Sequence, residues 1–444
     1  MAISRDPHDR CTFIPPWLAE RVDGAEQAAR DDALRTGRGA VARSARASAP
    51  DGLAERSAWT VHDAANGTSL PGTPARRADE PAIGDEAVDE AGVGIEATLT
   101  MFAEVFARDS HDGAGAPVSL TVHYGRDYNN AFWDGTQLVF GDGDGKVFER
   151  FTKPVDVLAH EFGHGVIEHT ADLTYSGQSG ALNESVADVF AACLKQRLLG
   201  QSAAEGDWLI GEGIFTPAVQ ARALRDMAAP GTAYDDPELG ADPQVGHMDD
   251  YVVTTSDNGG VHLNSGIPNR AFQLAAGGIG GSAVEGAGRI WYAALTGPDV
   301  RPRSDFAAFA AATVVAAGPH ADVVRAAWAQ VGVAPPIEVE VPVPEGTGGR
   351  LRVERSGGFV GRTESVEVDL DDPEQPDLRG LVEDSGLSAI DLADAPTTRP
   401  DMYLYTFTLD DHDPVCVPEH RLTASQAALA RRILLGHAED GGAR

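Results

Sequence analysis

The chain has few cysteines, and they are widely separated. Only 3 occur among 444 residues, at Cys11, Cys193 and Cys416, in what look like three different regions. So scattered a set does not indicate a disulfide framework. Residues 1–8 also lack the apolar segment that begins an ordinary secretory signal. We therefore expect the protein to be cytoplasmic or to be exported by a non-classical route.

Basic residues and long apolar runs are scarce too. Lys and Arg number 35 against 68 Asp and Glu, which gives a net charge of −33. Nucleic acids and anionic lipid surfaces attract basic patches, so this charge argues against both as partners. No apolar run approaches the roughly 20 residues that a membrane-spanning helix needs. The sequence therefore predicts no nucleic-acid partner and no membrane partner.

The run HEFGH at 160–164 carries the strongest chemical signal in the chain. On a helix, His160 and His164 lie on one face, one turn apart, and can bind one Zn²⁺. Glu161 would then lie beside the metal, where it can take a proton from a bound water. The alternative is a chance match on a helix surface, since the chain contains 13 histidines. The surrounding sequence has to decide between the two.

A second helical block follows about twenty residues later. Glu184 and Asp188 are again four residues apart, and Asn183 precedes them. A hydrolytic zinc site uses three protein ligands and leaves one position for water, so Glu184 is the candidate third ligand. Asn183 and Asp188 can accept the remaining imidazole N–H groups. The alternative is a capped, solvated helix. A third histidine ligand is disfavoured, because Ile167 and Thr170 occupy the glycine and histidine positions of the pattern HEXXHXXGXXH.

A third block, DNGGVHLNSG at 257–266, places His262 after a glycine-rich turn at the start of an apolar helix. Alone, it is typical of a structural histidine. Taken in order, however, the three blocks resemble the thermolysin-like zinc metallopeptidases. YNNAFW at 128–133, followed by GDGDG at 141–145, strengthens the resemblance. It runs from about Trp59 to about Val333 and implies hydrolysis of peptide bonds in proteins or peptides.

The resemblance assigns roles in the chemistry. His160, His164 and Glu184 are the implied ligands of one zinc ion, and Glu161 is the implied general base. The implied donors to the developing oxyanion are Tyr175 and His262, and Asp257 would orient His262.

The resemblance also assigns a substrate site. The side chains of Asn130 and Arg225 and the backbone of Ala131 are the implied holders of the substrate backbone. A pocket for a bulky apolar residue just after the cut would be lined by Phe148, Val157, Ile210 and Leu224. All four are apolar, so we expect this preference to be kept. Ordinary core packing is the alternative interpretation of these four residues.

Calcium is a further cofactor that the resemblance raises, and the sequence argues against it. Asp156, Asp207 and Glu212 fall at carboxylate positions of the family's double calcium site, but Lys195 and Leu209 stand where other carboxylates would be. Calcium takes six to eight oxygen ligands, and a lysine in that shell opposes binding. The run at 141–145 lacks the twelve-residue EF-hand pattern, so we expect a hairpin turn there rather than a calcium loop.

Residues 1–56 are interpreted as a leader. CTFIPPWL at 11–18 resembles the short leader of the protealysin-like subgroup, which carries a cysteine and a Pro-Pro-aromatic element. The resemblance implies a propeptide that covers the active cleft, through Cys11, Pro15 and Pro16, and that is cut off within 37–56. Cys11 either reaches the zinc or simply packs. The alternative for the whole segment is a disordered tail.

The rest of the chain divides into an α+β catalytic domain and a small α/β domain. Residues 57–153 are expected to form a β-rich lobe that starts with one helix and continues with strands. The helix is predicted from apolar residues that recur at helical spacing: Val88, Ala91, Ile95, Leu99, Phe102 and Phe106. Residues 154–333 are expected to form a mostly helical lobe in which Pro154 is a first helical residue. A linker occupies 334–349. In 350–440 we expect strands at 351–354, 365–370 and 402–409 and helices at 376–384 and 425–435.

This last region resembles emfourin, a small protein inhibitor of protealysin-like peptidases. The residues that carry the resemblance are RSGGF at 355–359, RPD at 399–401 and YLYTF at 403–407. It implies that the chain's own C-terminal domain is a ligand of the cleft, entering it through Ser356, Gly357, Gly358 and Phe359 or a neighbouring loop. The alternative is a module that only binds a substrate or a target surface. A second alternative, for the whole chain, is a catalytically silent zinc-binding scaffold.

Overall fold

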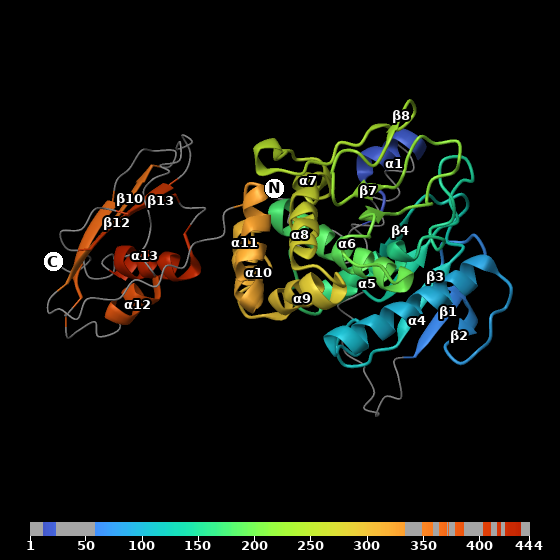
Figure 1. The fold of residues 1–444 in the computed structure, drawn as a ribbon, viewed down its shortest axis with the longest axis horizontal. Helices are drawn as coiled ribbons and strands as arrows, with labels where there is room; N and C mark the ends of the chain where they lie inside the picture. Colours follow the sequence, from blue (N-terminus) through green and yellow to red (C-terminus); the bar gives the residue numbers. More distant parts are fainter. Residues whose placement is uncertain are drawn as a thin grey trace. The chain divides into compact units, whose positions relative to one another are not determined.

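The computed structural model describes residues 12–23, 58–333, 349–357, 364–370, 372, 378–385, 403–409, 415–418 and 422–436. The chain forms two compact units, Met1–Pro335 and Pro336–Arg444 (Figure 1). Each unit contains a hydrophobic core of its own. Within the described ranges, no helix is long and apolar enough to cross a membrane.

The first unit begins, after helix α1 (Pro16–Asp23), with a five-stranded sheet in the order β2-β1-β3-β5-β4. β1 pairs in parallel with β3, and β3 with β5, while β2 and β4 pair antiparallel at the two edges. The bounds are β1 Trp59–Asp63, β2 Thr73–Arg77, β3 Val118–Val122, β4 Ala131–Trp133 and β5 Gln137–Phe140. β1 and β2 precede the helix of this lobe, where we expected the helix to come first.

Helix α4 (Glu86–Phe106) covers this sheet. The side chain of Asp85 accepts a hydrogen bond from the Val88 N–H and so caps its first turn. The apolar positions that predicted the helix are buried along its length, except Leu99, which is half-buried: Val88, Ala91, Ile95, Phe102 and Phe106. Spacing at three and four residues gives one continuous apolar face, which explains why the sequence predicted this helix.

The remainder of the first unit is mainly helical. Its helices are α5 Val155–Glu168, α6 Gly177–Leu199, α7 Asp257–Asn264, α8 Gly266–Ile279, α9 Arg289–Thr296, α10 Phe306–Ala316 and α11 Ala321–Gln330, with short helices η1 Met248–Asp250, η2 Val284–Gly288 and η3 Gly318–His320. Two short ribbons lie between α6 and α7: β6 Leu209–Ile210 with β7 Arg225–Asp226, and β8 Asp235–Asp236 with β9 Gly240–Ala241. Pro154 is the residue before α5 rather than its first helical residue.

The run Gly141–Gly145 forms a turn that reverses the chain after β5. The Gly145 N–H donates to the Phe148 carbonyl at 3.0 Å, and the Phe151 N–H donates to the Gly141 carbonyl at 3.0 Å. Asp144 Oδ1 also accepts the N–H groups of residues 146–148, which closes the turn locally. No described strand follows β5 before α5, so the turn does not join two strands of the sheet.

The second unit contains a four-stranded antiparallel sheet in the order β11-β10-β12-β13. Its elements are β10 Arg350–Gly357, β11 Glu364–Asp369, α12 Leu378–Ser385, β12 Tyr403–Leu409, β13 Val415–Pro418 and α13 Ala424–Gly436. Alternate residues Leu351 and Val353 of β10 are buried together with Leu429 and Ile433 of α13, so the helix covers one sheet face. β13 was not among the expected strands.

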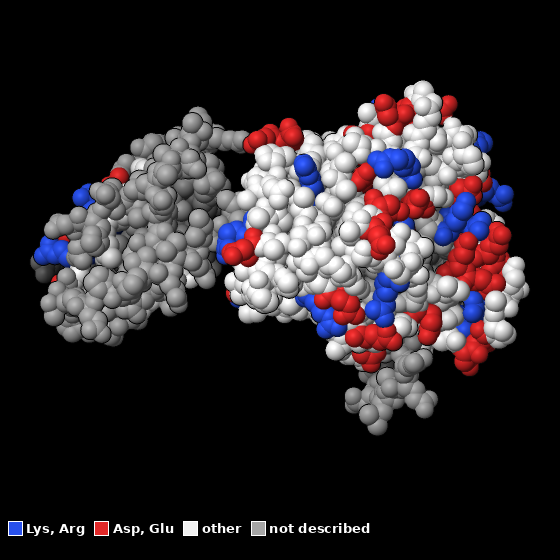
Figure 2. All heavy atoms as spheres, viewed as in Figure 1, with Lys and Arg blue, Asp and Glu red and all other residues white. Residues whose placement is uncertain are grey.

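Charged side chains are spread over the surface of the first unit. Figure 2 shows acidic and basic groups interspersed on the face turned toward the viewer. Some of the charged groups pair locally: Arg150 lies 3.0 Å from Glu86 and 2.7 Å from Glu90 on α4. Such ion pairs offset part of the acidic excess.

Candidate active site

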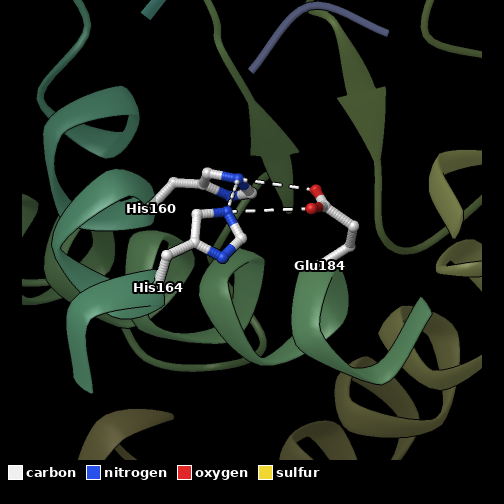
Figure 3. Close-up of side chains that lie close together, drawn as sticks. All are labelled: His160, His164 and Glu184. Carbon is white, nitrogen blue, oxygen red and sulfur yellow. Dashed lines mark hydrogen bonds and ion pairs between the residues drawn. The ribbon is translucent and has the colours of Figure 1, made fainter. Parts of the chain in front are cut away.

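Helices α5 and α6 pack closely and carry the site between them. Gly163 lies in the middle of the HEFGH run, and a Cβ added there would come within 3.1 Å of the Ala187 backbone on α6. A larger side chain at 163 would therefore force the helices apart. His160 and His164 project from α5 toward Glu184 on α6 (Figure 3). All three side chains are buried.

The two imidazoles face each other at a distance that a shared cation can bridge. His160 donates from Nδ1 to Asp188 Oδ1 at 2.8 Å, and His164 donates from Nδ1 to Asn183 Oδ1 at 2.8 Å. With both Nδ1 protons engaged, the Nε2 lone pairs point at one another across 3.0 Å. Glu184 oxygens lie 3.5 Å from Nε2 of His160 and 3.7 Å from Nε2 of His164. Three lone-pair donors converging in a buried site fit a divalent metal such as zinc.

The protonation states favour metal binding as well. Burial, aided by the neighbouring His160, lowers the pKa of His164 to about 4, so its imidazole is neutral at pH 7. Burial opposes ionisation of Glu184, but His262, His164 and His160 outweigh it and hold the pKa of that carboxyl at about 2. Glu184 Oε2 accepts no hydrogen bond from the described residues, and it lies 3.4 Å from His262 Nε2 and 3.5 Å from His160 Nε2. A neutral imidazole and an ionised carboxylate are the forms that ligate zinc.

Glu161 is placed as the candidate base. Its Oε2 accepts the Trp133 N–H at 2.7 Å, while its buried Oε1 has no partner among the described residues. Burial, together with the charge of Glu184, raises the pKa of Glu161 well above its usual range. A carboxylate with a raised pKa and one uncommitted oxygen can take a proton from a water that lies beside the three ligands.

Tyr175 and His262 both lie next to Glu184. The Tyr175 hydroxyl donates to Glu184 Oε1 at 2.6 Å and is 3.4 Å from His262 Nε2. Asp257 holds the His262 ring through Nδ1 at 2.7 Å and also accepts its backbone N–H. Burial opposes protonation of His262, but Asp257 and Glu184 outweigh it and raise the pKa. A charged imidazole can donate from Nε2 to a developing oxyanion.

The turn before His262 requires glycine. Four consecutive residues have a positive φ at the start of α7: Asp257 (51°), Asn258 (49°), Gly259 (89°) and Gly260 (78°). Such a run is strongly disfavoured for most side chains with a Cβ, although Asp and Asn tolerate it better than others. The glycine-rich turn therefore positions His262 rather than merely preceding its helix.

Residues 12–14 of the chain occupy this site. Phe13 is fully buried, with its ring edge-on to the His160 ring at a centroid distance of 5.2 Å. Its N–H donates to the Ala131 carbonyl at 3.0 Å, and Arg225 Nη1 donates to its carbonyl at 3.4 Å. The Ile14 N–H donates to Asn130 Oδ1 at 2.9 Å. The three groups proposed to hold a substrate backbone thus hold residues 13–14 of the chain.

The four expected pocket residues are at most 2 % exposed and belong to the hydrophobic core of the first unit, which also contains Phe13: Phe148, Val157, Ile210 and Leu224. Gly211 lies beside both Phe13 and Leu224, since a Cβ there would meet the Phe13 ring at 3.4 Å and Leu224 at 3.2 Å. The pocket is thus apolar and large enough for a phenyl ring.

The expected calcium positions contain a lysine ammonium. Lys195 Nζ lies 2.9 Å from Asp207 Oδ2, 2.7 Å from Glu212 Oε2 and 3.4 Å from the Leu209 carbonyl. Asp156 accepts the Gly211 N–H at 2.9 Å, and burial, opposed by Lys195, raises its pKa to about 6. The Lys195 ammonium therefore supplies the positive charge that faces Asp207 and Glu212.

The remaining candidates are placed as follows. Pro15 is buried, and its carbonyl accepts the N–H groups of Leu18 and Ala19 as Pro16 opens α1. Ser356 and Gly357 lie in β10 and pair with Leu404 and Tyr403 of β12 rather than in a loop. Cys11, Gly358 and Phe359 lie outside the described residues.

Sequence reasoning missed several contributors to the site. Thr12, Phe13 and Ile14 belong to the leader-like run at 11–18, but the sequence analysis did not predict that they contact the site, although a bulky apolar Phe13 suits the expected pocket. Asn269, which donates to Asp188 Oδ2 at 2.8 Å, gave no signal. The Trp133 N–H on Glu161 belongs to the backbone, which no side-chain pattern reveals.

Comparisons with known proteins cover most of the chain. Residues 52–168 match the model of the thermolysin metallopeptidase catalytic domain, residues 171–333 match that of its alpha-helical domain, and residues 353–434 match that of Emfourin. An extracellular metalloprotease of Pectobacterium carotovorum subsp. carotovorum is 46% identical over 337 residues, which are 73% of this chain and 96% of that protein. Protease PrtS of a Photorhabdus species (strain Az29) is 49% identical over 281 residues, 62% of this chain and 76% of that protein.

A solved structure agrees with these matches. The precursor of protealysin, a metalloproteinase from Serratia proteamaculans, is similar with a TM-score of 0.66 and 45% identity. The similarity covers 73% of this chain and the whole of that chain.

Proposed function

Because the chain belongs to the thermolysin family of metallopeptidases, we propose that it hydrolyses peptide bonds that precede bulky apolar residues. The family membership makes it a zinc metalloendopeptidase, and its C-terminal unit carries an emfourin domain. The specificity rests on one observation: the pocket beside His160 accepts the phenyl ring of Phe13 and leaves no exposed surface on it.

The catalytic roles follow from the geometry of the site. His160, His164 and Glu184 would hold the zinc ion, which when bound polarises the carbonyl and acidifies a water molecule. Glu161 takes the proton from that water and returns it to the leaving amine. His262, aligned by Asp257, and Tyr175 donate hydrogen bonds to the carbonyl oxygen as negative charge develops on it.

Substrate alignment is the task of a second group of residues. The Ala131 carbonyl, the Asn130 side chain and Arg225 would bind the substrate backbone just after the cut. Arg225 is itself fixed, because it donates to both oxygens of Asp188 at 2.7 and 2.8 Å. A rigid guanidinium keeps the substrate in register without a large loss of side-chain entropy.

We also propose that both flanking segments restrain activity and that calcium is not required. The leader covers the site through residues 12–23, and the emfourin domain acts as an inhibitor of the chain's own cleft or that of another copy. The Lys195 ammonium takes the place of a calcium ion among Asp156, Asp207 and Glu212.

The specificity is tested with quenched peptides that differ only in the residue after the cut. Enzyme freed of its leader should cleave Gly-Leu and Ala-Phe bonds at least about 10²-fold faster than Gly-Asp, because an apolar pocket cannot solvate a carboxylate. Leu224→Ala, which enlarges the pocket, is the matched variant. Equal rates for Leu, Phe and Asp would refute the assigned pocket.

A further inference from the structure

Residues Thr12–Ile14 cross the candidate site with the polarity of a bound substrate. Ala131 and Arg225 bind the N–H and the carbonyl of Phe13, and Asn130 binds the next N–H along the chain. From this register we infer that Thr12–Phe13 is the peptide bond presented for hydrolysis and that the enzyme cuts its own leader there. The inference rests on the proposed function and adds a specific self-processing bond to it.

Both sides of the Thr12–Phe13 bond contact groups suited to its hydrolysis. On one side, the Thr12 carbonyl oxygen lies 3.2 Å from His262 Nε2, the nitrogen that Asp257 orients toward the site. On the other side, the buried Phe13 ring lies beneath the Arg225 guanidinium, whose central carbon is 4.8 Å from the ring centroid. A carbonyl at the oxyanion donor and an apolar side chain just after it are the two requirements of the proposed specificity.

The chemistry consumes one water and needs no other reactant. The water oxygen bonds to the Thr12 carbonyl carbon, and the bond from that carbon to the Phe13 nitrogen breaks. Glu161 carries one water proton to the Phe13 nitrogen, which leaves as an ammonium group, and Thr12 becomes a carboxylate. The products are a peptide of residues 1–12 and a chain that begins at Phe13.

The cut does not by itself free the cleft, because most leader contacts lie after it. Leu18 is fully buried, the Trp17 ring packs edge-on to His262 at 6.1 Å, and Arg21 donates to the Leu239 carbonyl. Asn129 also donates to Asp23 at the end of α1. Residues 13–23 therefore remain bound as a product, so each molecule is expected to turn over once at this bond and stay covered.

The test follows the full chain by mass spectrometry during incubation with zinc. The diagnostic product is the 1–12 peptide with a free Thr12 carboxylate, whether or not a later cut occurs within 37–56. We expect the 1–12 peptide to form with first-order kinetics. Its rate constant should be independent of protein concentration, since the bond lies in the chain's own cleft. Glu161→Gln should form none.

Variants at position 13 test the register. Phe13→Leu should keep the cut, whereas Phe13→Asp should slow it at least about 10²-fold, because the pocket is apolar. Cleavage of Phe13→Asp at the wild-type rate would overturn the register. If leader-free enzyme cuts a quenched Ala-Phe peptide but the full chain keeps Thr12–Phe13 intact, the inference fails and the proposed function stands. If neither bond is cut, the proposed function fails and the inference falls with it.

Discussion

A single buried carboxylate, Asp188, joins the metal site to the substrate site. It accepts hydrogen bonds from His160, from Arg225 and from Asn269, and it is fully buried. Burial opposes its ionisation, but the charge of Arg225 and the His160 bond hold its pKa well below the usual range. The carboxylate therefore keeps its charge at every working pH and fixes a ligand and a substrate-binding arginine together.

Asp188→Asn should weaken both zinc binding and substrate cleavage. An amide cannot satisfy His160 Nδ1–H and both Arg225 donors with one oxygen, so we expect zinc affinity to fall about 10–100-fold. The measurement is competition with a chelator that reports free zinc, alongside kcat/KM on a quenched peptide. Asp172→Asn, on the loop between α5 and α6, is the matched control. Unchanged zinc affinity would show that Asp188 does not support His160.

Glu161→Gln should retain zinc and lose turnover. The substitution keeps the Trp133 N–H bond through the amide oxygen but removes the group that accepts the water proton, so kcat/KM should fall at least about 10³-fold. Metal content by mass spectrometry and peptide cleavage by fluorescence are measured on the same sample. Cleavage at more than a tenth of the wild-type rate would remove Glu161 from its assigned role.

Elements of the first lobe are joined by a charged histidine, His123. Its Nδ1 lies 2.8 Å from Asp142, after β5, and its Nε2 lies 3.2 Å from Asp85, the residue that caps α4. The hydrogen bond to Asp142, opposed by partial burial and supported by both carboxylate charges, raises its pKa to about 9. The pKa in the unfolded chain is about 6.5. Charged His123 therefore stabilises the fold below pH about 6.5, and this contribution is lost as the pH rises through 9.

His123→Asn should remove this dependence on pH. Asparagine tolerates the left-handed backbone at this position, where φ is 53°. We expect the stability difference between wild type and variant to shrink by about 1–2 kcal/mol from pH 6 to pH 9.5, allowing for solvent screening. Denaturant unfolding followed by tryptophan fluorescence reports on the first unit alone, because all 6 tryptophans precede residue 336. A constant difference across this range would contradict the prediction.

The segment between α6 and β6, where Lys195 pairs with Asp207 and Glu212, should not need calcium for its stability. Chelation of calcium is expected to leave the Tm of the first unit unchanged, because Lys195 already compensates Asp207 and Glu212. Lys195→Met leaves those carboxylates and buried Asp156 without their cation and should cost about 1–3 kcal/mol. Lys153→Met, which loses only the exposed pair with Glu149 at 3.5 Å, is the control. A Tm that falls on chelation in the wild type would refute the substitution of lysine for calcium.

The sequence predicted those elements whose residues follow a clear hydrophobic pattern or motif. α4 was predicted because its apolar residues recur over several turns, and α5 because the HEFGH run needs a helix to bring its two histidines to one face. β1 (WTVHD) and β2 (TPARR) are short and polar, and β13 (VCVP) ends in proline, so their pairing comes from neighbours distant in sequence. The ligands His160, His164 and Glu184 could be predicted because spacing along a helix determines which side chains share one face. The docking of Phe13 could not, since its partners lie more than 100 residues away.

At the scale of the whole molecule, the emfourin domain is expected to reduce activity. A version ending at Gly346, freed of its leader, should cleave a quenched Ala-Phe peptide at least several-fold faster than the full chain treated in the same way. Added 350–444 fragment should slow it again, and Glu161→Gln serves as the blank. Equal rates for the two versions would make the domain a binding module and leave the peptidase assignment intact.

Lys195 gives this enzyme a cation that cannot dissociate. A bound metal ion obeys mass action, so its occupancy, and the stability that it provides, follow the ion concentration of the surroundings. A side-chain ammonium is covalently attached, and its effective concentration at the site is the same in every compartment and at every dilution. The fold around α6 should therefore be equally robust in a calcium-poor cell interior and in a calcium-rich medium.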